Sequence, residues 1–234
     1  MTGTLYGLGI GPGDPDLITL KALKILQSTK VLAYPTLEEG DSLARSIVAP
    51  HLTGERTEIP IRIPMTVDRK PAQDAYDVAA EELKKHLEQG QDVSVLCEGD
   101  PFFYGSFMYL FGRIAEEYPV EVIPGVSSLT ACATALQAPL SARNDILTVL
   151  PAPLETSILR SRIEAADSVA IMKVGRHFDR VRTLIEEMQL MDKAQYIERA
   201  TLENQKILAL ADVPANAAPY FSMILIHKRG QAWK

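Results

Sequence analysis

The sequence is poor in cysteine. Its 234 residues include only two cysteines, Cys97 and Cys132, and each lies inside an apolar segment. Such a pair predicts buried free thiols in a reducing compartment and excludes a small fold held together by disulfides. Cysteine and histidine are nowhere spaced as in a zinc site, so we expect no metal bound by the protein.

Long apolar runs and an excess of basic charge are missing as well. No run approaches the ~18 residues of a membrane span, and the N-terminus lacks the basic region and apolar core of a secretion signal. We therefore expect a cytoplasmic protein without a membrane partner. The net charge of -6 argues against a general nucleic-acid binder, whose affinity comes from a basic surface, although it leaves room for local basic pockets.

The composition that remains is that of an ordinary globular protein, 47% hydrophobic and 23% charged. Up to Tyr118, predicted strands alternate with helices, which indicates an α/β domain with a mostly parallel sheet. Pro35 should stop the second strand, Ser42 should open a helix, and residues 68–71 should form a polar connector. The strands are expected at residues 3–8, 31–34, 59–65 and 93–97.

The strand pattern restarts beyond Pro119. Several strands follow one another toward the end of the chain, so the second sheet should be partly antiparallel. We expect two α/β domains, residues 1–118 and residues 119–234. Strands are expected from residue 120 and at residues 146–150, 169–174, 195–199, 207–210 and 221–227, with helices within residues 154–166 and 178–188.

Residues 93–106 hold the most informative stretch. Its first five residues are mostly apolar, which suits a strand covered on both faces, and the Glu-Gly-Asp-Pro of residues 98–101 then ends that strand. Gly99 allows another group to approach the backbone, and ligands bind at the carboxyl ends of strands in open α/β sheets. Alternatively, Asp100 simply caps the helix that holds Phe103, Phe107 and Leu110.

Glycines alternate through residues 7–13. They do not form a dinucleotide fingerprint, because Pro12 and Asp14 stand where a third glycine should be, and a phosphate-binding loop would need a lysine. A loop whose backbone approaches a ligand and a purely structural tight turn are both compatible with this pattern. Asp14 before Pro15 predicts the start of a helix that continues through Ile25.

A third glycine turn follows the strand that begins at Val120. Peptide N–H groups at such a turn suit a carboxylate or a ribose oxygen. Ser127 and Ser128 could equally be plain helix caps.

These segments resemble, in their order and spacing, the tetrapyrrole (corrin/porphyrin) methyltransferase family, and the resemblance covers essentially the whole chain. Three longer stretches, residues 97–109, 171–176 and 219–223, are similar to the branch that methylates carbon 20 of precorrin-2. The matching motifs are Gly9-Ile-Gly-Pro-Gly-Asp14, Glu98-Gly-Asp-Pro101, Pro124-Gly-Val-Ser-Ser128, Ile171-Met-Lys173, Glu198-Arg-Ala-Thr201 and Tyr220-Phe-Ser-Met-Ile-Leu-Ile226.

The resemblance implies S-adenosylmethionine as methyl donor, held in a cleft between two α/β domains, and usually a homodimer. Ser222 stands where relatives often have alanine, and Met172 could equally be a core methionine of a buried strand. Carried over by motif, the donor contacts would be Pro12, Glu98, Gly99, Asp100, the backbone near Phe103, Ser127, Ser128, Met172, Ala200 and Ser222.

The implied reaction is an in-line displacement at a sulfonium, so the protein mainly has to hold sulfur, methyl group and acceptor carbon in a row. The implied substrate is the reduced tetrapyrrole precorrin-2 or its cobalt-bearing relative, whose acceptor carbon is electron-rich. A weak base would then suffice to manage a proton. Asp14, Glu98 and Tyr104 are the candidates. The competing interpretation is that Asp14 caps a helix, Glu98 and Asp100 bind the donor, and Tyr104 packs.

The implied substrate carries many carboxylates, which would have to meet local positive charge in an acidic protein. We therefore expect a basic rim at the site, although many surface arginines have no such role. The candidates near predicted strand ends and loops are Arg45, Arg62, Arg113, Arg143, Arg176, His177 and Arg199.

Two kinds of alternative remain open. The first is another methyltransferase of the family, such as the enzyme that methylates uroporphyrinogen III to make precorrin-2, or members that methylate protein or ribosomal RNA. The acidic balance of the chain weakens the RNA alternative. The second is a regulatory module that binds the donor without catalysis.

Overall fold

The structure is a computed structural model that describes residues 1–38, 40–64 and 70–229. It divides into two compact units, Met1–Ser127 and Ser128–Lys234. The division therefore follows Ser127 rather than Tyr118, because the strand Val120–Ile123 pairs with the first strand of the chain. None of the helices in the described ranges is both long and apolar enough to cross a bilayer.

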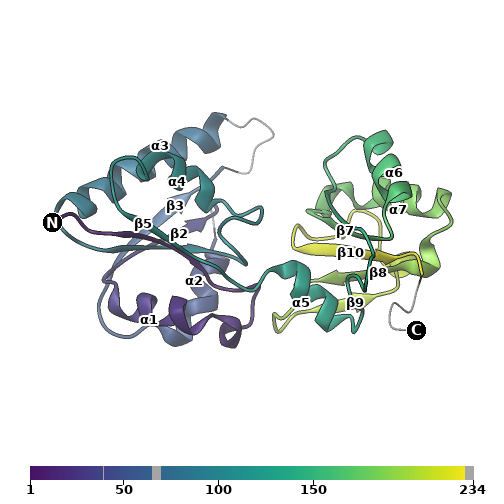
Figure 1. The fold of residues 1–234 in the computed structure, drawn as a ribbon, viewed down its shortest axis with the longest axis horizontal. Coiled ribbons are helices and arrows are strands. Elements are labelled where there is room, and N and C mark those ends of the chain that lie inside the picture. The colour runs from purple at the N-terminus through teal and green to yellow at the C-terminus, as the bar shows by residue number, and fades with distance from the viewer. Residues whose placement is uncertain (39, 65–69, 230–234) are drawn as a thin grey trace. The chain divides into compact units, whose positions relative to one another are not determined.

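The first unit is a five-stranded parallel sheet in the order β3-β2-β4-β1-β5, which confirms the predicted parallel α/β fold. Two helices cover each face (Figure 1): α1 and α2 lie on one, α3 and α4 on the other. The elements are β1 (Leu5–Gly9), α1 (Leu20–Ser28), β2 (Val31–Thr36), α2 (Leu43–Val48), β3 (Thr57–Arg62), α3 (Lys70–Glu88), β4 (Val93–Cys97), α4 (Phe107–Ile114) and β5 (Val120–Ile123).

The second unit contains a mixed sheet in the order β6-β7-β10-β8-β9. Only β6 and β7 are parallel, and the other pairs are antiparallel, which confirms the predicted mixed sheet. Helices α6 and α7 pack on one face around a core that includes Ile171, Tyr196 and Ile224. The elements are α5 (Ser128–Ala135), β6 (Leu147–Pro151), α6 (Thr156–Ala165), β7 (Ser168–Met172), α7 (Phe178–Glu187), β8 (Ala194–Glu198), β9 (Lys206–Leu208) and β10 (Ser222–His227).

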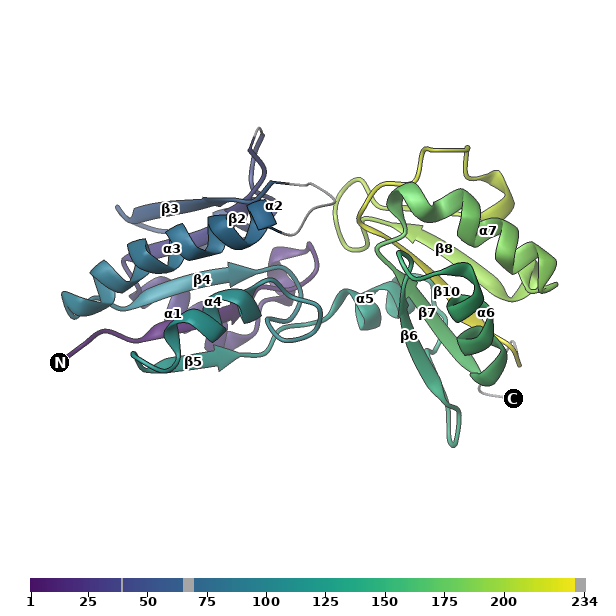
Figure 2. The same ribbon diagram turned by 90° about the horizontal axis from the view of Figure 1, so that it is seen from above.

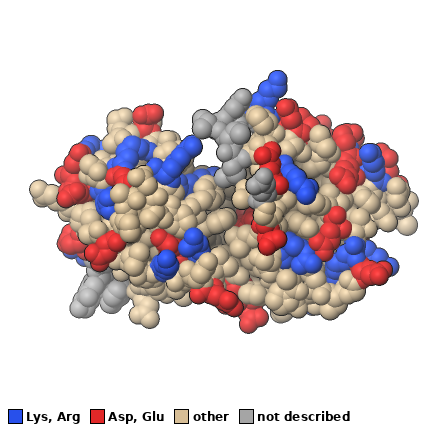
Figure 3. All heavy atoms as spheres, turned by 180° about the vertical axis from the view of Figure 1, so that it is seen from behind, with Lys and Arg blue, Asp and Glu red and all other residues tan. Residues whose placement is uncertain are grey.

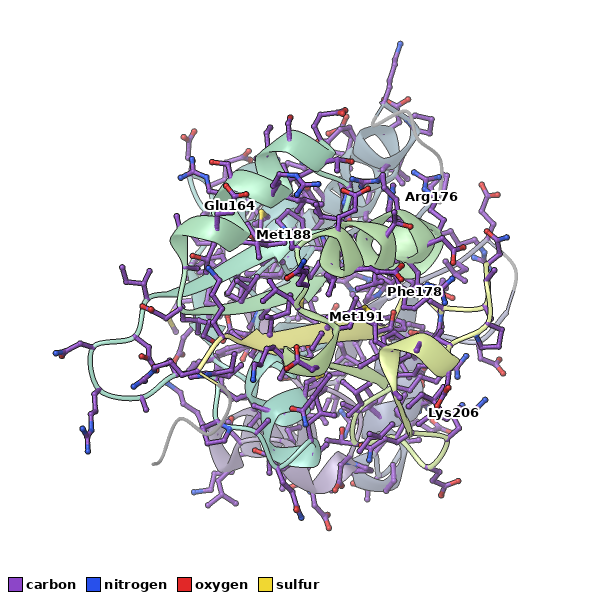
Figure 4. The ribbon with its side chains drawn as sticks, turned by 90° about the vertical axis from the view of Figure 1, so that its right-hand side faces the viewer. Glu164, Arg176, Phe178, Met188, Met191 and Lys206 are labelled. Carbon is purple, nitrogen blue, oxygen red and sulfur yellow. The ribbon has the colours of Figure 1, made fainter. Side chains whose placement is uncertain are left out.

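Helix α7 begins beside the carboxyl end of β7. Figure 4 shows Arg176 and Phe178 toward one side of this unit and Glu164 and Met188 toward the other. The ring of Phe178 packs edge-on against Tyr196, with 5.3 Å between centroids. The turn between β7 and α7 is thereby fixed at one end of the sheet.

Several predicted boundaries were wrong. Strand β2 continues through Pro35 to Thr36, because β4 pairs with β2 only as far as Ala33 and the N–H that proline lacks is not needed beyond that point. The first helix does not start at Asp14. That carboxylate accepts from the N–H of Asp16 and opens only a short 3-10 turn.

Helix α1 instead begins after Thr19, whose hydroxyl accepts from the N–H of Ala22 at 3.2 Å. Ser42 caps α2 as predicted, since its hydroxyl accepts from the N–H of Arg45. Lys70 and Pro71 belong to α3 rather than to a connector, and the rest of the predicted connector lies outside the described residues. Helix α4 holds Phe107 and Leu110 as predicted but starts too late to include Phe103.

Both cysteines are buried free thiols, as predicted. Burial raises the pKa of the Cys97 thiol to about 11 and that of the Cys132 thiol to about 12. We expect both thiols to react with iodoacetamide at pH 8 far more slowly in the native protein than in 6 M guanidinium, because the thiolate is the reactive form. Mass spectrometry of timed samples measures this, and fast native labelling of either residue would contradict it.

Candidate functional site

Three loops meet at the carboxyl edge of the first sheet. Strands β4, β1 and β5 are neighbours and parallel, with Gly9 opposite Cys97 and Leu8 opposite Ile123. The segments that follow these strands therefore leave the sheet at the same end, which Figure 2 shows for β4 and β5. This edge brings together the glycine run after β1, the turn at residues 98–101 and the turn at residues 124–127.

The loops touch through glycine backbone. A Cβ on Gly125 would lie 2.1 Å from the carbonyl oxygen of Gly99, and a Cβ on Gly9 would lie 2.5 Å from the nitrogen of Gly125. The N–H of Gly99 donates to the carbonyl of Gly11 at 2.8 Å. These glycines are required for close packing of one loop on another. Of the two interpretations that the sequence left open, the contacts favour the structural turn for Gly9.

Asp100 ties two of these loops together. Its Oδ2 accepts from the N–H of Gly125 at 3.0 Å, and its Oδ1 accepts from the N–H of Phe102 at 2.9 Å. The carboxylate thus closes its own turn and links it to the turn after β5. It does not cap α4, which begins at Phe107.

Glu98 follows the last residue of β4 and is partly exposed. Burial raises its pKa above the ordinary value, while the N–H groups of Glu98 itself and of Ala44 act in the opposite direction. A carboxyl group in such a place can take and return a proton closer to neutral pH than a solvated one. Glu98 is therefore the site carboxyl best suited to proton transfer.

We expect Glu98→Gln to stabilise the protein at neutral pH. A carboxyl whose pKa is raised by folding favours the folded state below its unfolded pKa, and this advantage is lost as the pH rises through the folded pKa. The variant should match the parent near pH 4 and exceed it in free energy of unfolding near pH 8. Urea unfolding at both values measures this, and a variant less stable than the parent at pH 8 would contradict it.

The other predicted residues of the first unit lie in the same loops. Tyr104 adopts a left-handed backbone, with φ 56, and its partly exposed ring packs edge-on against Phe103. Asp14 and Pro12 lie in the loop after β1, and Ser127 is the last residue of the unit. The structure thus brings the predicted residues numbered up to 127 to one edge.

The predicted contacts of the second unit also gather at one end of their sheet. Met172 is the last residue of β7 and pairs with Met223, Ala200 follows the end of β8, and Ser222 is the first residue of β10. The Ser222 hydroxyl donates to the carbonyl of Pro219 at 2.7 Å, so a serine is accommodated where the resemblance favours alanine. Ser128, by contrast, begins α5.

A buried pair that the sequence analysis did not identify lies beside these residues. The hydroxyl of Tyr196, a fully buried residue, donates to Glu198 at 2.9 Å. The other oxygen of Glu198 lies 3.4 Å from a guanidinium nitrogen of Arg199. The sequence could have indicated this pair, because side chains two residues apart in a strand, such as Tyr196 and Glu198 in β8, lie on the same face.

We expect Tyr196→Phe to lower the free energy of unfolding by about 1–3 kcal/mol, because it removes the 2.9 Å hydrogen bond to one oxygen of a buried carboxylate and leaves only the long contact with Arg199 at the other. Tyr118→Phe is the matched control. The Tyr118 hydroxyl also donates to a glutamate, Glu88, but on the surface, so its loss should leave stability nearly unchanged. Urea unfolding of both variants gives the comparison, and equal losses would show that burial of the pair does not matter.

Some of the predicted basic residues are engaged within their own unit. Arg45 binds Glu58 through two nitrogens, and Arg113 binds Asp77 at 2.6 Å. Arg176 contacts His177, whose pKa is lowered by burial and by two neighbouring arginines. On the face shown in Figure 3, basic and acidic side chains are interspersed. The expected basic rim therefore stays a prediction.

Comparison with known proteins gives consistent matches. Residues 4–213 match the profile of the Tetrapyrrole (Corrin/Porphyrin) Methylases. A precorrin-2 C(20)-methyltransferase of Sinorhizobium sp is 38% identical over 232 residues, 96% of this chain and 95% of that protein. A cobalt-precorrin-2 C(20)-methyltransferase of Salmonella typhimurium is 34% identical, over 98% of each chain. A uroporphyrin-III C-methyltransferase of Thermus thermophilus, complexed with S-adenyl homocysteine, has a similar fold, with TM-score 0.68 and 20% identity over 97% of this chain and 92% of that one.

Proposed function

Because the chain belongs to the tetrapyrrole (corrin/porphyrin) methylase family, we propose that it transfers a methyl group from S-adenosylmethionine to carbon 20 of precorrin-2 or of cobalt-precorrin-2, a step of cobalamin biosynthesis. The proposal is supported by relatives that bear these names and align with nearly the whole chain. It is also supported by the loop arrangement of the first unit. The hydrogen bond from Gly125 to Asp100 is the observation that carries it, because it joins two of the motifs that distinguish the family.

The residues at the first edge fit a donor of this kind. S-adenosylmethionine supplies a methyl group on a cationic sulfur, and its amino and ribose hydroxyl groups need acceptors. Glu98 is a carboxyl group that has lost part of its hydration, so such donors would restore hydrogen bonds to it. The glycine contacts pack the loops directly against one another, which fixes the turn that carries Glu98 and Asp100 at this edge.

We assign donor contacts to Pro12, Glu98, Gly99, Asp100 and the backbone near Phe103 in the first unit, and to Met172, Ala200 and Ser222 in the second. Ser127 and Ser128 join this set as the link between the units. Positioning is the main contribution of these residues, since well-aligned reactants can lower a barrier by up to ~7–11 kcal/mol.

In this proposal Glu98 is the residue that accepts and returns a proton during the reaction. Asp14 and Tyr104 lie in loops at the same edge, but the Asp14 carboxylate accepts from the N–H of Asp16 and the Tyr104 ring packs on Phe103. Glu98 combines a position at the end of β4 with a pKa raised by burial. Loss of its carboxyl should therefore lower turnover more than loss of either of the others.

We further propose a homodimer in the cytoplasm. Phe102, Met108 and Tyr109 are 39–51% exposed on and just before α4, which is more apolar surface than a solvated helix needs. The two buried free thiols suit a reducing compartment. Light scattering of the purified protein gives the mass directly, and a monomer at micromolar concentration would contradict the dimer.

The decisive experiment is incubation with methyl-labelled S-adenosylmethionine and either precorrin-2 or cobalt-precorrin-2, followed by carbon NMR of the product. A label at carbon 20 is the expected result, and the preferred acceptor identifies the substrate. A label at another carbon would assign a different reaction of the family. Binding of the donor without transfer to either tetrapyrrole would instead favour a regulatory module.

A further inference from the structure

Three non-glycine residues adopt a left-handed backbone conformation at one end of the second sheet. Lys173 follows β7 with φ 57, and Arg199 and Thr201 follow β8 with φ 48 and 71. This region is disfavoured for residues that carry a Cβ, and glycine is the usual occupant. Strain of this kind persists where the surrounding structure enforces it, and it clusters at binding sites.

The two basic residues of this set flank the start of β10. Lys173 comes directly after Met172, which pairs with Met223. On the other side of β10, the N–H of Arg199 donates to the carbonyl of Phe221 at 2.8 Å. Neighbouring strands lie ~4.8 Å apart, so the two backbones are separated by roughly 10 Å. Two long cationic side chains at this spacing can reach one acidic molecule.

The surroundings favour an anion at this position. Lys173 is half-buried, and burial lowers its pKa, which means that its ammonium has lost hydration. One guanidinium nitrogen of Arg199 contacts the buried carboxylate of Glu198, which also accepts a hydrogen bond from the hydroxyl of Tyr196. A single long contact of 3.4 Å to that carboxylate leaves most of the guanidinium donors for another partner.

An exposed aromatic pair adjoins these cations. Tyr220 and Phe221 are each 48% exposed, and their rings meet edge-on with 5.2 Å between centroids. The turn after Lys173 lies against the backbone of Tyr220, because a Cβ on Gly175 would lie 3.5 Å from the Cα of Tyr220. Positive charge and apolar ring surface thus occur on adjoining segments.

We propose that Lys173 and Arg199 form a carboxylate-binding pair and that Tyr220 and Phe221 supply the apolar surface beside it. This inference rests on the proposed function, whose reactants combine carboxylates with extended ring systems. The carboxylate belongs either to the acidic side chains of the tetrapyrrole or to the amino-acid part of the methyl donor, and the two sources can be separated by binding measurements.

The test uses Lys173→Gly. At a left-handed position this substitution should change stability and ligand binding in opposite directions, so the two effects can be told apart. Glycine removes both the strain and the ammonium, so the variant should have a higher Tm but bind the ligand about tenfold more weakly. Gln189→Gly is the matched control. Gln189 has φ 56 just after α7 and is exposed, so glycine there should raise Tm without changing any affinity. Lys173→Arg should retain most of the affinity.

Two probes identify the source of the carboxylate. The stable octacarboxylate uroporphyrin III, followed by fluorescence anisotropy, reports tetrapyrrole binding without turnover. S-adenosylhomocysteine, followed by calorimetry, reports the donor site. Weaker binding of only one probe by Lys173→Gly and Arg199→Gln assigns the pair to that ligand. Parent-like affinities for both probes would overturn the pair, whereas absence of methyl transfer by the parent protein would overturn the proposed function.

Discussion

Gly125→Ala should lower the free energy of unfolding by about 3 kcal/mol, the upper end of the cost of overpacking. The added methyl group would lie 2.1 Å from the Gly99 carbonyl oxygen and 2.7 Å from the Cα of Gly9, and both are backbone atoms that no rotamer change can move. This steric clash can be relieved only if one of the loops moves away from the edge of the sheet. We therefore expect donor affinity to fall together with stability, as measured by calorimetry with S-adenosylhomocysteine.

Gly112→Ala is the control for this experiment. Gly112 lies inside α4, and a Cβ there meets no atom within 4 Å. Alanine should raise the free energy of unfolding by about 1 kcal/mol, because it favours the helix and its methyl group would clash with nothing. The same substitution thus has opposite signs at two positions of one unit. Urea unfolding of both variants measures the difference, and a Gly125→Ala protein as stable as the parent would show that the loops do not depend on this contact.

The fold was largely predictable because hydrophobic periodicity reports on each element separately. The apolar run at residues 93–97 predicted a strand covered on both faces, and β4 is buried at every residue. Strand ends were less predictable. Whether Pro35 ends β2 depends on how far β4 extends alongside it, and that pairing is not written in the local sequence.

The candidate site was predicted as a set of positions but not as a set of contacts. Parallel strands put the turns after β1, β4 and β5 at one edge of the sheet, and this placement could be predicted from the strand pattern. The partner of Asp100 could not, because a donor contact and a local helix cap were the two roles that the sequence offered, and the carboxylate reaches Gly125 on another loop. Likewise, no local rule reveals that Lys173 adopts a left-handed conformation.

Asp100→Asn should weaken donor binding by at least about tenfold and lower the free energy of unfolding by about 1–3 kcal/mol. The carboxylate accepts from two peptide N–H groups, those of Phe102 and Gly125. An asparagine has only one acceptor oxygen, so its amide would direct N–H donors at one of these two N–H groups. The turn would then separate from the loop after β5 or lose its own closure.

Asp92→Asn separates this effect from the general cost of losing a carboxylate. Asp92 also accepts from a backbone N–H, that of Thr4 at 2.7 Å, but through a single oxygen that asparagine retains, and just before β4 rather than after it. The control should keep both stability and donor affinity. If Asp100→Asn and Asp92→Asn bind S-adenosylhomocysteine equally well in calorimetry, the bridge from Asp100 to Gly125 does not organise the donor site, and glycine packing and the hydrogen bond from Gly99 to Gly11 suffice to arrange the loops at this edge.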